Sequence, residues 1–514
     1  LYLFRIDSFT QNCPITHIFF VFSTMLKIGS SLLFSFLFYV QLSAQSFDYS
    51  ENCKQAYHAI YKLKINEGMQ WLAKEKKEHP KNFLPIFLEN HADFLKLNIN
   101  DNRALYDNTK SRVEYRLERL KDGDKNSPFY LYTLAEIHLQ WAFCKIKFGE
   151  YVSAVFEVRK AYQMLLDNKK KFPDFKPNTK SLGLLHTLFG AVPDKYKFGA
   201  KLLGLKGSIE QGLAELNSVM QDDDFQFRDE TILMYTLLML HLQKDETTSW
   251  NMIQSAEIPL NDNLLNYFVA ATVANHTGKN DKMIEILTDR PVGSAYYPFP
   301  YLDFMLGFAK LNRLDSNADV YIKKFITQNK GRSYQKEAYR KLAWYYLVNG
   351  QPALYRKYMQ QILLIADAPT DEDKSAQKEA LQNVIPQQEL LKARLLFDGA
   401  YYEKALTVLD DISFDKLSNS RDKIEYFYRK ARIYDELNKS NDAIKFYLLT
   451  IEKGADFKYY FAANACLKVA TIFERLLKQN MAIKYYKKAI DLDKDEYANS
   501  IDAEAKAGLN RLGE

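Results

Sequence analysis

Cysteine is scarce in this sequence, with 4 residues in a chain of 514. Three of them, Cys53, Cys144 and Cys466, lie far apart, and no two cysteines have the spacing of a zinc site. The cysteines therefore provide neither a disulfide framework nor a zinc motif that could organise the chain. Cys144 and Cys466 fall among Ala and Leu residues at helical spacing, and we expect both to be buried thiols.

Glycine and proline are also sparse, at 19 and 14 residues, and alternating runs of β-branched residues are few. Aromatic residues are abundant instead, with 35 Tyr and 34 Phe, and 47% of the chain is apolar. This apolar content excludes wholesale disorder, and the scarcity of turn and strand signals favours an all-helical chain. Because 514 residues exceed one compact core, we expect either several domains or an extended solenoid.

Signals for chemistry are missing as well. The sequence contains no HExxH, GxSxG, CxxC or dinucleotide-binding fingerprint, and no two of its 8 histidines have metal-site spacing. The acidic run Asp222, Asp223 and Asp224 lacks the Gly and the terminal Glu of a calcium loop. The net charge of +6, without a long basic run, argues against nucleic acid as a partner. We therefore expect no catalytic residue, no metal and no cofactor.

The N-terminal residues have the pattern of a targeting signal. A basic start at Lys27, an apolar run over 31–40 and small residues up to Ala44 predict a secretory signal over 25–44 that is cleaved after Ala44. Residues 1–24 are then expected to be an upstream extension of the reading frame. The alternative is a membrane anchor, but Lys27 divides its apolar runs and neither reaches the ~20 residues that a bilayer requires. The predicted location is the periplasm or the cell exterior.

The strongest pattern in the chain lies between residues 424 and 493. Large and small side chains alternate there at spacings of three, four and nine residues, and the same order occurs twice. Small residues at helix crossings let two backbones approach closely, and the large ones fill the space around each crossing. The first set is Phe427, Ala431, Tyr434, Ala443, Tyr447 and Thr450, and the second is Cys466, Ala470, Phe473, Ala482, Tyr486 and Ala489.

In this pattern the chain resembles the tetratricopeptide-repeat (TPR) superfamily, most clearly over 386–493 and also over 128–166 and 334–362. Its overall layout, with the signal that ends at Ala44, resembles that of secreted TPR proteins of Bacteroidota. The resemblance implies an all-α fold: a right-handed α-α superhelix, or TPR-like solenoid, of stacked helical hairpins. It also implies that the first helix of each hairpin lines a concave groove that binds peptides or proteins.

The remaining segments differ in how regular they are. Residues 181–216 hold six of the glycines among many leucines, which predicts closely packed helices or turns with positive φ. They are either an inserted hairpin that fills the solenoid or a surface for a partner or a membrane. Residues 367–378 are acidic and contain Pro369, which predicts a loop. The expected divisions are N-terminal hairpins over 45–180, the insertion over 181–216, divergent hairpins over 217–385, and C-terminal repeats with a capping helix over 386–514.

The resemblance also implies which residues face the groove. Arg394 and Arg432 occupy equivalent positions in successive repeats, and two guanidinium groups could bind a carboxylate or an acidic peptide. The alternative is that they pair within the chain, with Asp398, Asp435 or Glu436. The complete set of groove positions is Arg394, Tyr428, Arg432, Asp435, Leu467, Glu474 and Arg475.

These observations predict a non-enzymatic scaffold that binds a protein or peptide partner in the periplasm or cell envelope. Two alternatives remain open. One is a cell-wall or glycan-active enzyme built on a helical solenoid, which requires a pocket with converging carboxylates. The other is a membrane-associated TPR protein that uses residues 181–216, which requires that their leucines form an exposed patch.

Overall fold

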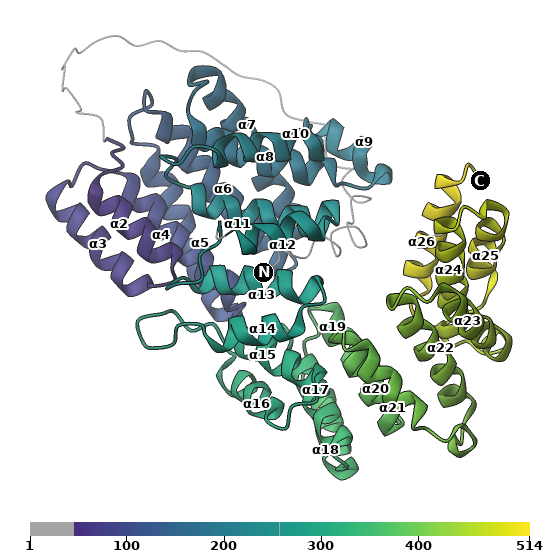
Figure 1. Cartoon of the computed structure of the whole chain (residues 1–514). Coiled ribbons are helices and arrows are strands. Elements are labelled where there is room, and N and C mark those ends of the chain that lie inside the picture. Colours follow the sequence, from purple (N-terminus) through teal and green to yellow (C-terminus); the bar gives the residue numbers. More distant parts are fainter. Residues whose placement is uncertain (1–45, 256) are drawn as a thin grey trace, which may run out of the picture. The chain divides into compact units, whose positions relative to one another are not determined.

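The computed structural model describes residues 46–255 and 257–514 (Figure 1). It forms two compact units. Unit 1 comprises the chain up to Thr277 together with Glu285–Leu302 and Gln328–Arg332, and unit 2 comprises Gly278–Ile284, Asp303–Thr327 and Ser333–Glu514. The predicted signal over 25–44 and the extension over 1–24 lie outside the described residues.

Both units are helical, and an isolated bridge between Ser46 and Asn82 is the only β-type pairing in the described part of the chain. The helices of unit 1 are α2 (Glu51–Tyr61), α3 (Ile65–Glu78), α4 (Leu84–Ile99), α5 (Arg103–Leu120), α6 (Pro128–Lys147), α7 (Tyr151–Lys171), α8 (Lys176–Gly190), α9 (Asp194–Leu202), α10 (Ile209–Met220), α11 (Arg228–Leu238), α12 (Glu246–Gln254) and α13 (Leu264–His276). A short π-helix over Met239–Gln243 follows α11.

Unit 2 likewise consists of consecutive helices. They are α15 (Tyr301–Asn312), α16 (Ala318–Gln328), α17 (Gln335–Val348), α18 (Pro352–Leu364), α19 (Asp371–Gln382), α20 (Gln388–Asp398), α21 (Tyr402–Asp410), α22 (Ser420–Glu436), α23 (Ser440–Gly454), α24 (Tyr460–Arg475), α25 (Gln479–Asp491) and α26 (Ala498–Arg511). Helix α14 (Asn280–Thr288) contributes to both units. Consecutive helices pack as hairpins, such as α6 with α7, α22 with α23 and α24 with α25. The all-α class and the stacking of helical hairpins are therefore confirmed.

The C-terminal hairpins bury the residues that the repeat pattern singles out. Ala431 and Ala443 at one crossing, and Ala470 and Ala482 at the next, are fully buried. Tyr447 is buried beside the first crossing, as Tyr486 is beside the second. Because a hairpin of two short helices cannot cover its own apolar face, each one depends on its neighbours for a continuous core.

The glycine-rich segment forms a tight hairpin of α8 and α10, with α9 between them. A Cβ atom on Gly183 would lie 3.0 Å from the Gly212 carbonyl oxygen, and one on Gly207 would lie 2.5 Å from His186 Cα. Gly204, by contrast, has φ of +78° and open space around it. Both expected reasons for these glycines, close helix packing and left-handed turns, are therefore confirmed. The hairpin extends beyond residues 181–216, since α8 begins at Lys176 and α10 ends at Met220.

The prediction of a loop over 367–378 is wrong from Asp371 onward, where α19 begins. The hydroxyl of Thr370 accepts a hydrogen bond from the backbone N–H of Asp373 and so caps the helix. The acidic residues that suggested a loop occupy the first turn, where negative charge is favourable to the helix dipole. Ala376 and Ala380 bury the opposite face of the helix.

No helix in the described ranges is long and apolar enough to cross a bilayer. Within the glycine-rich segment, Leu182, Leu184 and Leu185 are buried, whereas Phe198 and Leu202 are exposed on one face of α9. The leucines of α8 thus belong to the core of unit 1.

Candidate functional site

The seven predicted groove residues lie on α20, α22 and α24, the first helices of the three C-terminal hairpins. Two of them, Tyr428 and Leu467, are only 2% and 3% exposed and belong to the core of unit 2. Arg394, Arg432, Asp435 and Glu474 are partly exposed, and Arg475 is exposed. Tyr428 uses its hydroxyl within the fold, where it donates a hydrogen bond of 2.8 Å to Asn464.

Asp435 ties neighbouring hairpins together. It accepts hydrogen bonds from Tyr447 of the same hairpin, at 3.4 Å, and from Arg475 of the next one, at 2.6 Å. These bonds pair Asp435 and Arg475 with other residues of the fold. Neither side chain is therefore free to bind a ligand.

Glu474 repeats this arrangement one hairpin later. It accepts from Tyr486, at 2.5 Å, and from two guanidinium nitrogens of Arg511, each at 2.9 Å. The bonds from Arg511 hold the pKa of Glu474 below its usual range, although burial opposes the shift. Two successive hairpins therefore use a carboxylate on the first helix, a tyrosine on the second helix and an arginine from the element that follows.

The two arginines have a different environment. The Arg394 guanidinium lies 4.6 Å from the centroid of the Trp344 ring, and the Arg432 guanidinium lies 4.7 Å from that of Phe397. Arg394 has Asp398 at 3.9 Å, with 34% of the arginine side chain exposed. Arg432 donates to the Tyr428 hydroxyl at 3.2 Å and has no carboxylate within 4 Å among the described residues. Aromatic faces hold both guanidinium groups in place but do not neutralise them.

A third cation joins them from α24. Lys468 is partly buried, and in the part of the chain that the structure describes no carboxylate lies within salt-bridge distance of it. Burial lowers the pKa of Lys468, and the positive charge of Arg432 lowers it further, whereas the charges of Glu504, Asp435 and Glu436 act in the opposite direction. We refer to Arg394, Arg432 and Lys468 as the cation cluster.

Lys468 is not among the predicted groove residues. It could have been predicted from its position, because it directly follows Leu467 on a helix that was expected to face the groove. The proposed pairing of the arginines with Asp435 does not occur, because Arg475 occupies that carboxylate. Arg394 does have its expected neighbour Asp398, at the long end of salt-bridge distance.

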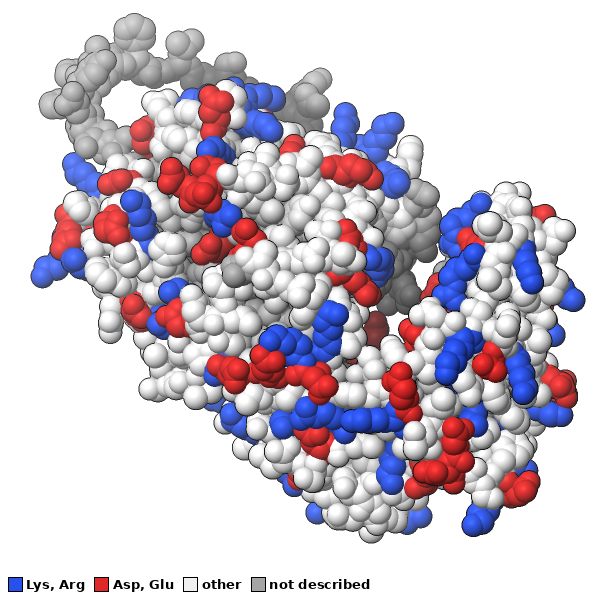
Figure 2. Space-filling model, viewed as in Figure 1, with Lys and Arg blue, Asp and Glu red and all other residues white. Residues whose placement is uncertain are grey.

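On the face of the molecule in Figure 2, Lys and Arg side chains alternate with Asp and Glu, and no large area carries a single sign. Within the described residues, no group of three or more His, Cys, Asp or Glu side chains could hold a metal ion. The cluster can attract a carboxylate, since two of its three cations have none within 4 Å in the described ranges.

Comparisons with known proteins add the following. No family model and no curated protein matches the chain. Among solved structures, the chain is similar to one in the crystal structure of the APC/C hetero-tetramer Cut9–Hcn1, at 10% identity and a TM-score of 0.25, over 90% of this chain and 97% of that one. It is also similar to a structure of Naa15/Naa10 bound to HypK-THB, at 14% identity and a TM-score of 0.24, over 90% and 66% of the two chains. The third is yeast Tom70, at 14% and 0.22, over 85% and 97%. At these TM-scores the similarity says nothing of a partner or an activity.

Proposed function

We propose that the protein is a non-enzymatic helical-repeat scaffold that binds an acidic segment of a partner protein at the cation cluster. The observation that carries the proposal is that Arg432 and Lys468 are partly buried, close enough to affect each other's charge, and without a carboxylate within 4 Å among the described residues. Two neighbouring cations that are partly removed from water repel each other, and burial is unfavourable to both. A carboxylate from outside the chain would offset both the repulsion between the two cations and the unfavourable effect of their burial.

The geometry of the cluster suits an extended peptide. The guanidinium groups of Arg394 and Arg432 rest over the rings of Trp344 and Phe397, which reduces the side-chain freedom that is left to lose on binding. A guanidinium group presents a planar set of donors that can bind a carboxylate in a bidentate manner. The cations come from α20, α22 and α24, so acidic side chains spaced along one strand of peptide could meet them in turn.

A peptide of six glutamates with a fluorescent label tests this proposal. We expect it to bind, and we expect its affinity to fall about tenfold or more in the variant Arg432→Met with Lys468→Met, which keeps the aliphatic stems but removes both charges. The measurement is fluorescence anisotropy at fixed ionic strength. A peptide of six glutamines with the same label reports binding that does not depend on charge.

The matched control is Lys445→Met with Lys484→Met. These lysines are exposed on α23 and α25, the second helices of the hairpins, and removing them changes the net charge by the same amount. The control is expected to change affinity by no more than about twofold. An equal loss in both double variants would mean that overall charge attracts the peptide, and the cation cluster would then not be the site. Failure of the glutamate peptide to bind would contradict an acidic partner.

The proposed setting is the periplasm or cell envelope, and the predicted signal over 25–44 supports it. Expression of the whole chain in a Gram-negative host should give an exported protein whose first residue is Gln45, because small residues precede that position. N-terminal sequencing of the periplasmic fraction measures this. Retention of the whole chain in the cytoplasm would contradict the proposed location but would leave the peptide-binding proposal intact.

A further inference from the structure

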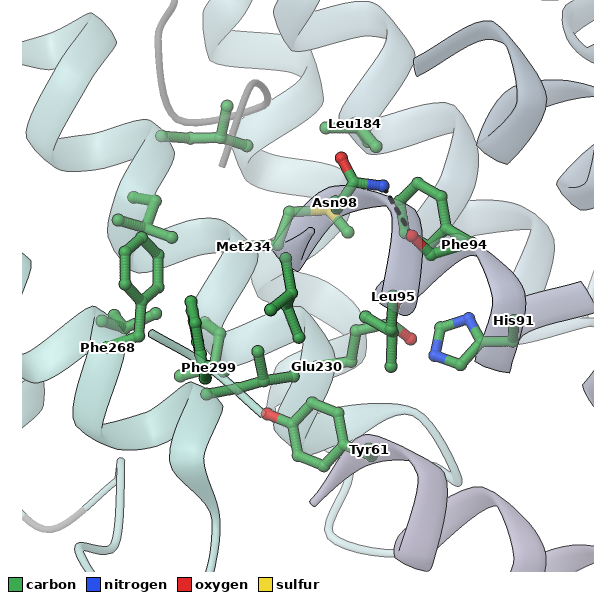
Figure 3. A pocket seen from close by; sticks show the side chains of 16 residues that line it. Tyr61, His91, Phe94, Leu95, Asn98, Leu184, Glu230, Met234, Phe268 and Phe299 are labelled. Carbon is green, nitrogen blue, oxygen red and sulfur yellow. Dashed lines mark hydrogen bonds between the residues drawn. The ribbon is translucent and has the colours of Figure 1, made fainter. Parts of the chain in front are cut away.

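Unit 1 contains a cavity of about 120 Å³ that no part of the proposed scaffold function uses. Helices α2, α4, α8, α11 and α13 surround it, and Phe299 completes its wall (Figure 3). An engineered cavity of about 150 Å³ lined by apolar side chains binds benzene, so this one is of the order of size that takes a molecule of about six non-hydrogen atoms.

Most of the wall is apolar. Leu95 of α4, Met234 and Leu237 of α11, Phe268 of α13 and Phe299, which precedes α15, line the space together with further leucines. Burial of a benzene-sized group against such a wall is favourable, because apolar surface leaves water and the wall gains contact atoms.

Glu230 places a carboxylate in this apolar surrounding. One of its oxygens, Oε2, accepts hydrogen bonds from Tyr57 at 3.2 Å and from Lys180 at 3.4 Å. The other, Oε1, accepts none from the described residues. The side chain of Glu230 is 22% exposed although it lies deep inside unit 1 and lines the cavity, which indicates that its accessible surface faces the cavity.

His91 places a donor beside the same space. Asn90 donates to the Gln140 side-chain oxygen at 2.8 Å, so the Gln140 amide nitrogen is turned toward His91 and donates to its Nδ1 at 3.2 Å. With Nδ1 acting as acceptor, the proton of the neutral imidazole lies on Nε2. His91 is only 3% exposed, and its Nε2 has no hydrogen-bond partner among the described residues.

From these contacts we infer that the cavity is a binding site for a small, uncharged apolar molecule that carries one hydroxyl group. A hydroxyl can donate to Glu230 Oε1 and accept from His91 Nε2, whereas a protonated amine has no lone pair with which to accept and an ether has no proton to donate. A carboxylate is disfavoured, because the two buried carboxylates Glu136 and Glu230 already outnumber the one buried cation that they share, Lys180.

Phenol and benzene are the probes, since they differ only by the hydroxyl group. In the whole protein we expect phenol to bind at a single site and about tenfold more tightly than benzene, because its hydroxyl pairs buried groups that otherwise lack partners. Ligand-observed NMR titration measures both affinities. The variant His91→Phe keeps a ring of similar shape but removes the donor, and it should reduce the preference for phenol to about twofold or less.

Two more variants test whether the probes bind in this cavity. Val269→Phe adds bulk to the cavity wall and should abolish binding of both probes. His138→Gln is the matched control, because His138 is also a largely buried histidine of unit 1 but is paired with Glu157 and lies outside the cavity. It should leave both affinities within about twofold.

The remaining outcomes decide against the site. Equal binding of phenol and benzene would show a generic apolar void, and binding of neither would show that the cavity takes no ligand. Phenol binding that survives Val269→Phe would place it elsewhere. Hexanoate binding more tightly than phenol would overturn the assignment of an uncharged hydroxyl compound. All of these leave the peptide proposal untouched, because the cavity and the cation cluster lie in different units.

Discussion

Replacement of Lys180 by methionine is expected to lower the free energy of unfolding by about 3–5 kcal/mol, measured by urea unfolding with tryptophan fluorescence. Lys180 is 3% exposed and lies 3.7 Å from Glu136 and 3.4 Å from Glu230. Methionine keeps much of the apolar stem but removes the ammonium group, which lies 5.0 Å from the centroid of the Phe227 ring. The main loss is therefore the charge, and two buried carboxylates remain without a cation.

The pH dependence of this penalty follows from the pKa shifts. Burial opposes the charged form of Lys180, but Glu136 and Glu230 raise its pKa well above the usual range. Burial likewise opposes ionisation of Glu230, but Lys180 and His91 lower the pKa of Glu230. In the wild type the contribution of Lys180 is present below the usual lysine pKa of about 10.4 and is lost only as the pH rises through the raised value. The contribution of Glu230 is present above about 4.3 and is lost as the pH falls through the lowered value.

In the Lys180→Met variant Glu230 lacks this cation and can instead take up a proton as the pH falls. We therefore expect the penalty to be larger at pH 8 than at pH 5. Lys170→Met is the control: its side chain is 78% exposed, and the change should stay within about 0.5 kcal/mol at both pH values. A penalty that is the same at pH 8 and pH 5 would show that lost packing, rather than charge, determines it.

The substitution Gly212→Ala is expected to destabilise unit 1 by about 3 kcal/mol. Helix propensity alone predicts the opposite, a gain of about 1 kcal/mol, because alanine is the better helix former. The added Cβ, however, would overlap the Thr187 hydroxyl oxygen, the Thr187 backbone nitrogen and the Gly183 carbonyl oxygen. Two of these three atoms are backbone, so α8 and α10 would have to move apart.

Gly204→Asn is the matched control for Gly212→Ala. Gly204 lies in the same hairpin at φ of +78°, with no atom within 4 Å of an added Cβ, and asparagine tolerates this left-handed conformation better than most residues. Urea unfolding should therefore show a loss of no more than about 1 kcal/mol for it. Stabilisation by Gly212→Ala would mean that the two helices cross less closely than described here.

The C-terminal hairpins could be predicted in detail from the sequence. Each buried position there depends on spacing within one pair of helices, so Ala431 and Ala443 could be placed at a crossing without knowledge of the rest of the chain. The close approach of α8 and α10 was predictable for a similar reason, because so many glycines in a short segment rarely have another explanation. The helix over 371–382 was missed because its cap, Thr370, and its buried alanines were given less weight than Pro369 and the acidic run.

The chemistry of the two sites could not be predicted in the same way. Among the described residues Arg432 has no carboxylate within 4 Å, and the nearby Asp435 is engaged by Arg475, which follows it by 40 positions in sequence. The cavity in unit 1 brings together residues as far apart as Tyr61 and Phe299. At both sites the chemistry depends on which polar atoms have hydrogen-bond or ion-pair partners. Side chains from several helices together determine these partners. Periodicity along the sequence carries no information on this.

The hydrogen bonds to Asp435 and Glu474 have the same orientation along the C-terminal hairpins, because in both cases the donor arginine follows the carboxylate in sequence. Each of these two carboxylates accepts a hydrogen bond from an arginine of the element that follows it, Arg475 on α24 and Arg511 on α26. In a stack of hairpins each unit is stabilised only by the elements next to it. Loss of one of these arginines should therefore loosen first the helix that carries its carboxylate. Removal of α26 would take away the partner of Glu474 and so weaken α24, the helix that also carries Lys468.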